Sequence, residues 1–314
     1  MKKLAILIWM YHNDLADEFL ELLYPLQDLV DIHLSFCQDN DNLKSLSQFN
    51  NLSNIKSITY YPNIGADLYS FINDLSLIQN EYFIKLHTKK SNWGNNGRCN
   101  WRAMLLDSLI GNRDTLIKNI QYIEKYKLGS IGCGSLIYNN LENKHSYHIN
   151  KICQIINLEK TVKKLFFAGN MFMGKTKLFQ DYINSNTINQ LNELLQLEGG
   201  KINDINQGTY SHGMERVLGY MGAKEKLYPC PLSTFKIRVI DQSLVDKIQY
   251  LHIRRMYNSE VYCIEQPNIY GKLLSESAGG KTLQISWRSQ GKEILAVYHQ
   301  ISKRIYLNEK HIHK

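Results

Sequence analysis

The stretch Tyr82-Phe83-Ile84-Lys85-Leu86-His87-Thr88-Lys89-Lys90-Ser91 is predicted to form a short apolar strand that ends in a dense group of hydrogen-bond donors. Side chains alternate along a strand, so three cationic side chains are expected on one face: Lys85, His87 and Lys89. Three more donors stand where the strand passes into a loop rich in glycine and asparagine: Thr88, Lys90 and Ser91. Ligands of open α/β sheets bind beyond the carboxyl ends of the strands, so this cluster suits a phosphate or a pyrophosphate. The alternative is a basic strand end that is simply exposed to solvent.

The pattern around this strand predicts an α/β fold. Strands are expected at 3–11, 31–37, 55–61, 82–89 and 128–133, with helices between them at 15–29, 41–49, 68–79 and 100–126. Repeated βα units of this kind predict a Rossmann-like, mostly parallel sheet flanked by helices.

The second half of the chain is less regular. A strand is expected at 166–174, and helices at 176–198 and 208–220. Beyond about residue 231 the pattern is mixed, with candidate strands at 233–240, 282–287 and 294–298 and a candidate helix at 243–256. We therefore divide the chain into a main domain, residues 1–230, and a C-terminal mixed α/β extension, residues 231–314. The extension is a candidate for contact with an acceptor or a membrane surface.

Composition indicates an acidic partner. The 314 residues carry a net charge of +8 and are 44% hydrophobic, which is enough for a full core. The charge favours nucleic acid, an anionic membrane surface or a phosphorylated substrate without choosing among them. The six cysteines show no CxxC spacing, which suits a reducing cytoplasm and indicates neither a zinc ribbon nor a redox pair. No apolar run is long enough to span a bilayer, so we expect a cytoplasmic protein with peripheral contact at the inner face of the cell membrane.

Three further clusters place polar residues where such a fold binds ligands. The first is Asn63-Ile64-Gly65-Ala66-Asp67 at a strand-to-helix turn, where glycine allows close approach and the helix start presents free N–H groups. Asp67 either caps this helix or binds a ribose or a base. The second is Phe166 to Met173, which is otherwise a core strand with a glycine bulge. The third is His212 to Tyr220, whose Glu-Arg pair is also a common surface feature.

These clusters belong to a longer series of motifs between residues 11 and 220. The series comprises Tyr11-His12, N-x-G-x-D at Asn63 to Asp67, K-L-H-T-K-K-S at Lys85 to Ser91, Trp101-Arg102, A-G-N-M-F at Ala168 to Phe172, and G-T-x-x-H-x-x-E-R at Gly208 to Arg216. Its order resembles that of GT-A glycosyltransferases. Its residues resemble more specifically the rhamnan synthesis protein F family of bacterial polysaccharide and lipopolysaccharide glycosyltransferases. Two departures are Ala66, where the family commonly has an arginine, and Met173, where an aromatic residue is common.

The resemblance implies transfer of a sugar, often a 6-deoxyhexose such as L-rhamnose, from a nucleoside diphosphate donor to a glycan or lipid-linked glycan acceptor. We expect an inverting mechanism in which Glu215 is the general base and His212, one helical turn earlier, assists it. The expected donor-binding residues are Tyr11, His12, Asn63, Gly65, Asp67, His87, Thr88, Lys89, Lys90, Ser91, Gly169, Asn170 and Met171. Residues expected to contact the acceptor or support the site are Trp101, Arg102 and Arg216, the last by pairing with a carboxylate at the sheet end.

One departure from the common GT-A layout concerns metal. No D-x-D aspartates stand at the end of strand 82–89, and a hard divalent cation requires oxygen ligands. We therefore expect catalysis without a metal cofactor, with His87, Lys89 and Lys90 neutralising the leaving diphosphate. The alternative is that Asp67 or Asp204 folds in as a metal ligand.

Two other functions remain open at this stage. The protein could be a non-catalytic subunit of glycan assembly, or a basic α/β protein that binds nucleic acid. The 20 tyrosines are not interleaved with basic residues on any strand platform, so a nucleic-acid partner is not expected.

Overall fold

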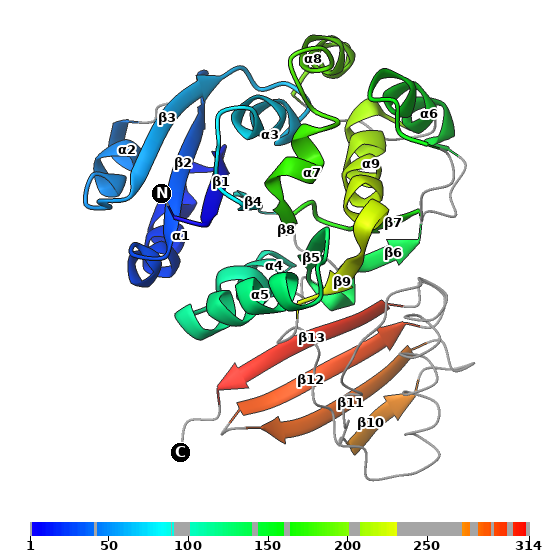
Figure 1. Cartoon of the computed structure of the whole chain (residues 1–314). Helices are drawn as coiled ribbons and strands as arrows, with labels where there is room; N and C mark the ends of the chain where they lie inside the picture. Colours follow the sequence, from blue (N-terminus) through cyan, green and yellow to red (C-terminus); the bar gives the residue numbers. More distant parts are fainter. Residues whose placement is uncertain are drawn as a thin grey trace.

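The computed structural model describes residues 2–40, 43–88, 90, 101–139, 144–159, 164–200 and 208–230, and four strands between residues 272 and 311. Seven strands form the main sheet, in the order β3-β2-β1-β4-β8-β5-β9 (Figure 1). Their bounds are β1 Leu4–Met10, β2 Val30–Cys37, β3 Ile55–Tyr61, β4 Tyr82–His87, β5 Ser130–Gly132, β8 Phe172–Lys175 and β9 Leu227–Pro229. Neighbours are parallel except where β8 lies antiparallel between β4 and β5. The predicted α/β class with a mostly parallel sheet is confirmed.

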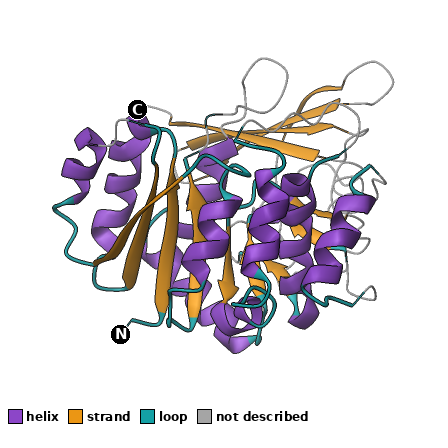
Figure 2. Ribbon diagram, turned by 90° about the horizontal axis from the view of Figure 1, so that it is seen from above, coloured by secondary structure: helices purple, strands orange, loops and turns teal. Residues whose placement is uncertain are grey.

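Helices cover both faces of this sheet (Figure 2). The α-helices are α1 Ala16–Leu23, α2 Leu43–Phe49, α3 Leu68–Leu75, α4 Trp101–Ile110, α5 Arg113–Lys125, α6 Ser146–Ile155, α7 Thr176–Gln180, α8 Ile188–Gln196 and α9 Tyr210–Glu225. Three short 3₁₀ turns accompany them: η1 Asn13–Leu15, η2 Tyr24–Leu26 and η3 Gly134–Leu136. All of β1 is buried, because its alternate residues enter two different cores. One core includes side chains of α1, α4 and α5, and the other includes side chains of α3 and α6 to α9.

The helix predicted at 100–126 is wrong in one respect, because the structure divides it into α4 and α5. Asn112 has an extended backbone and its side chain accepts a hydrogen bond of 2.8 Å from the N–H of Thr115. An asparagine in this position starts a new helix. The helix predicted at 176–198 is likewise divided, into α7 and α8, with Thr187 just before α8 hydrogen-bonded to Tyr182 O at 2.7 Å.

The strand predicted at 166–174 is also two elements. β7 (Leu165–Phe167) pairs with β6 (Ile137–Asn139) in a small antiparallel sheet, whereas β8 lies in the main sheet. Between them the backbone turns through left-handed conformations at Gly169, with φ of 92°, and at Asn170, with φ of 57°. Glycine and asparagine are the residues that adopt this conformation most readily.

The C-terminal part contains a four-stranded antiparallel sheet. Its strands are β10 Lys272–Glu276, β11 Thr282–Ser289, β12 Lys292–His299 and β13 Arg304–His311. The strands predicted at 282–287 and 294–298 are confirmed as parts of β11 and β12. The elements predicted at 233–240 and 243–256 lie outside the described residues, and the division of the chain at residue 230 stays a prediction. None of the helices within the described ranges has the length and hydropathy of a membrane span.

Candidate active site

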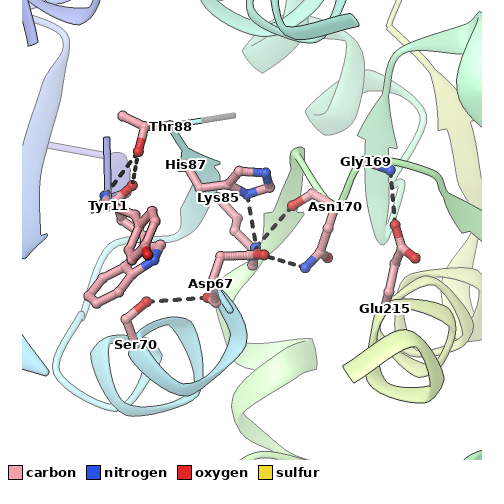
Figure 3. A network of polar contacts seen from close by, with 10 residues as sticks. Tyr11, Asp67, Ser70, Lys85, His87, Thr88, Gly169, Asn170 and Glu215 are labelled. Atoms are coloured by element: carbon pink, nitrogen blue, oxygen red, sulfur yellow. Dashed lines mark hydrogen bonds and ion pairs between the residues drawn. The ribbon is translucent and has the colours of Figure 1, made fainter. Parts of the chain in front are cut away.

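Two basic side chains of β4, those of Lys85 and His87, turn toward the start of α3 (Figure 3). Lys85 Nζ forms an ion pair with the carboxylate of Asp67, and its side chain is only 2% exposed. His87 Nδ1 lies 3.2 Å from Asp67 Oδ2. The alternation predicted for Lys85 and His87 therefore agrees with the structure, which adds a carboxylate from another element as their shared partner.

Asp67 occupies the N-cap position of α3, but its side chain does not cap the helix. Burial by itself would raise the pKa of this carboxyl group. The neighbouring His87 and Lys85 outweigh burial and hold the pKa of Asp67 well below its usual range. The capping alternative for Asp67 is therefore wrong, and the ionised carboxylate joins α3 to β4.

The turn between β7 and β8 connects this cluster to α9. Asn170 donates from its side-chain Nδ2 to Asp67 Oδ2 at 2.8 Å, and its backbone carbonyl oxygen accepts from Lys85 Nζ at 3.1 Å. The preceding residue, Gly169, donates its backbone N–H to Glu215 Oε1 at 2.9 Å (Figure 3). Two adjacent residues thus attach the strand-end cluster to one side of the turn and the Glu215 carboxylate to the other.

Glu215 lies in the second turn of α9, with its side chain 17% exposed. Arg216 approaches Glu215 Oε2 at 3.5 Å, donates to His212 O at 2.8 Å, and stacks its guanidinium 4.8 Å above the ring of Phe166. Among the contacts of the described residues, the carboxylate beside Arg216 is that of the adjacent Glu215, and the aromatic ring of β7 lies against the guanidinium. Pairing of Arg216 with a carboxylate at the sheet end stays a prediction.

A second connection between α3 and α9 runs through the residues after α8. Gly199 O accepts the N–H of Gly65 at 2.9 Å, and Gly65 itself is left-handed, with φ of 57°. The carboxylate of Glu198 accepts the N–H groups of Tyr210 and Ser211, the latter at 2.9 Å. A carboxylate at a helix start satisfies free N–H groups and complements the helix dipole. Glu198 had no signal of its own in the sequence, since its partners lie 12 and 13 positions further on.

Several predicted donor-binding residues serve the scaffold. The Thr88 hydroxyl accepts the N–H groups of Tyr11 and His12 at 2.9 and 2.8 Å, which fixes the end of β1 against β4. Lys90 forms a 2.6 Å ion pair with Asp14. Burial, together with the charge of Lys90, lowers the pKa of His12. Both lysines that the structure describes at this strand end, Lys85 and Lys90, therefore already form ion pairs with aspartates. The order of the motifs along the sequence did not predict these pairs.

The other predicted residues lie apart from the Asp67 cluster or outside the described residues. Asn63 packs against Gly200, where a Cβ would lie 2.3 Å from Asn63 Cγ. The side chain of Met171 is fully buried in the core that also holds side chains of α4 and α5, so it does not join the donor cluster. Arg102 forms a bidentate contact with Glu18 that ties α4 to α1, with Nε 3.0 Å from both oxygens. Lys89, Ser91 and the side chain of Trp101 lie outside the described residues.

Metal ligation is a separate question. Within the described ranges, no three side chains of histidine, cysteine, aspartate or glutamate form a group suited to a metal ion. Residues 88–91 contain no carboxylate. The carboxylate of Asp67 lies near this strand end instead, and it is paired with Lys85 and His87. Asp204, the other alternative, lies outside the described residues, and metal independence stays a prediction.

Comparison with known proteins identifies the family. The family model described as rhamnan synthesis protein F matches residues 1–227. Similar solved structures include residues 1–349 of TarS from S. aureus, at 12% identity, and the same protein in complex with UDP, at 11% identity. Each has a TM-score of 0.35 and an alignment that covers 82% of this chain and 72% of the other. No match was found among curated proteins. Because the family model covers more than two thirds of the chain, the protein belongs to the rhamnan synthesis protein F family of glycosyltransferases, as its motifs predict.

Proposed function

We propose that this protein transfers a sugar from a nucleoside diphosphate donor to a hydroxyl group of a surface glycan, with inversion at the anomeric carbon. One observation carries the proposal: Gly169 and Asn170 hold the Glu215 carboxylate and the Asp67 cluster on two sides of a single turn. A direct displacement needs a base for the incoming hydroxyl and polar groups for the departing diphosphate. These two sets of groups must be held at a fixed distance from each other. This turn provides both from adjacent residues.

The chemical step follows from this arrangement. Glu215 takes the proton of the acceptor hydroxyl while the oxygen attacks the anomeric carbon. The bond between that carbon and the phosphate oxygen breaks, and its electron pair leaves with the nucleoside diphosphate. Gly169 N–H and Arg216 orient the two carboxylate oxygens of Glu215.

The negative charge that develops on the leaving diphosphate is stabilised by residues at the end of β4. Asp67 balances Lys85, so the three-residue cluster is neutral with an uncharged His87 and carries one positive charge when the imidazole is protonated. We propose that His87 and Lys89, together with Lys90 once it exchanges Asp14 for the phosphate, stabilise the diphosphate by charge-assisted hydrogen bonds.

The finer assignments are also proposals. The family resemblance supports a 6-deoxyhexose such as L-rhamnose as the sugar and a glycan or lipid-linked glycan as the acceptor. The net charge of +8 supports peripheral contact of a cytoplasmic enzyme with an anionic membrane surface.

The decisive experiment is Glu215→Gln, which preserves shape and removes basicity. Turnover should fall by about 10²–10⁴-fold, whereas a thermal-shift panel of nucleoside diphosphates should give the same ligand-dependent rise in melting temperature as the parent protein. Glu225→Gln is the matched control, because Glu225 lies on the same helix and contacts Lys175. Near-normal turnover in Glu215→Gln would disprove the assignment, and retention of anomeric configuration in the product, followed by NMR, would disprove direct displacement.

A further inference from the structure

The residue that precedes α9 contacts the histidine of the G-T-x-x-H-x-x-E-R motif twice. Thr209 is the N-cap of α9, and its Oγ1 lies 3.1 Å from the backbone N of His212. The same oxygen lies 2.7 Å from His212 Nδ1. The first contact is ordinary helix capping, and the second reaches the imidazole. The sequence motif alone does not reveal that Thr209 makes both.

The protons of these groups determine the direction of the second contact. Thr209 Oγ1 accepts the backbone N–H of His212, and it has one proton of its own to donate. His212 Nδ1, 2.7 Å away, is an acceptor within reach of that proton. With Nδ1 as the acceptor of this proton, the proton of the neutral imidazole stands on Nε2.

Neighbouring groups hold Thr209 in place. Its backbone N–H points to Nδ1 of His145 at 3.4 Å, and His145 is fully buried. The rings of His145 and His212 lie 5.5 Å apart. Gly208 has a φ of +73°, and a Cβ there would lie 2.4 Å from Lys144 O and 2.9 Å from His145 Nδ1. A larger residue at 208 would therefore displace the backbone that presents Thr209.

We infer that Thr209 is a positioning residue that fixes the tautomer of the His212 imidazole, with the proton of the neutral ring on Nε2. In this tautomer His212 donates a hydrogen bond through Nε2–H and cannot take a proton there. The two polar residues of the motif then have separate roles, with Glu215 as the base and His212 as a donor that binds an acceptor oxygen. This division of roles rests on the proposed function, whereas the tautomer itself does not.

The test uses the full chain with ¹⁵N-labelled histidine and long-range ¹H–¹⁵N spectra of the imidazoles. His212→Gln identifies the His212 signals by their loss. In the parent protein, Nδ1 should resonate as a non-protonated nitrogen and Nε2 as a protonated one. Thr209→Ser should preserve this pattern, because serine caps the helix and donates in the same way.

Thr209→Asp separates the tautomer from capping. Aspartate is also a good N-cap, so α9 should remain folded, but a carboxylate can only accept, and the Nδ1 signal should move to the protonated range. A protonated Nδ1 in the parent protein, or an Nδ1 signal that stays non-protonated in Thr209→Asp, would overturn the inference. Because these spectra need no turnover, their outcome is independent of the Glu215→Gln assay.

Discussion

At the residue scale, the site depends on one carboxylate with partners from two other segments. Asp67 from the start of α3 contacts Lys85 and His87 of β4 and Asn170 of the β7–β8 turn. A buried ion pair of this kind contributes little relative to an apolar replacement, but loss of one partner leaves the other charge buried and unpaired. Asp67 therefore serves both the stability of the main domain and the electrostatics of the site.

Asp67→Asn should lower the free energy of unfolding at pH 7 by about 3–5 kcal/mol, because Lys85 loses its counter-charge in a buried site. The pKa of Asp67 is depressed on folding, so its contribution is present above the unfolded-state pKa of about 3.9 and is lost as pH falls below it. Urea unfolding measured from pH 7 down to pH 3 should therefore show a difference between the two proteins that shrinks with acid.

Asp14→Asn is the matched control for this series. Asp14 pairs with Lys90 at the surface, where its side chain is 64% exposed, so its removal should change stability little. Equal stability of Asp67→Asn and the parent protein at pH 7 would show that the cluster is not the buried ion pair described above.

At the scale of elements, α9 is the helix on which the site is built, and its glycines allow close packing. Gly219 lies against the backbone of β7, where an added Cβ would be 2.3 Å from both Leu165 O and Phe166 Cα. Gly213 faces α6 with more room, since its nearest contact would be His148 Cβ at 3.1 Å. The approach of α9 to β7 also places the ring of Phe166 under Arg216, beside Glu215.

Gly219→Ala should destabilise the protein by about 1–3 kcal/mol or more, because a backbone neighbour cannot move aside as a flexible side chain can. Gly213→Ala provides the comparison within the same helix, where the gain in helix propensity, about 1 kcal/mol, offsets the tighter contact. Urea denaturation of both variants measures the difference. Equal midpoints would contradict the close contact between α9 and β7.

The sequence predicted elements better than it predicted their ends. The range 55–61 agrees with β3 because apolar alternation and the following Pro62 define the strand locally. The breaks before α5 and within 176–198 were missed, because they depend on local hydrogen bonds of the Asn112 and Thr187 side chains. The division of 166–174 was missed for a different reason: both halves are apolar, and only pairing with β6 or with β4 and β5 distinguishes them.

At the scale of the whole molecule, the site is assembled from segments far apart in the sequence. The motif order predicts that residues 63–67, 85–88, 169–170 and 212–216 belong to one site, and the structure joins Asp67, Lys85, His87 and Asn170 by contacts and Gly169 to Glu215. The motif order could not indicate their partners, since Lys85 and Asn170 are 85 positions apart, and Gly169 and Glu215 are 46 apart. The charge balance of the strand end follows from these long-range contacts and was therefore not predictable from local pattern.

The same contacts bear on metal dependence. Asp67, the carboxylate that lies beside the end of β4, is paired with Lys85 and His87 and not offered to a metal ion. Turnover should therefore continue in saturating chelator. Lys89→Ala, assayed under the same conditions, should lose most activity if this lysine stabilises the leaving diphosphate. Loss of turnover in chelator with recovery on addition of manganese would show that the cluster opens to hold a cation.

The described residues just before position 201 and at the start of α9 are held by hydrogen bonds with each other and with the start of α3. Gly199 is bonded to Gly65, and Glu198 holds the first N–H groups of α9. The position of Glu215 is thus set independently of how many residues connect the two anchors. We therefore expect that the number of residues between these two anchors can change without moving Glu215, the proposed general base, so the connection is a practical place to insert or exchange residues.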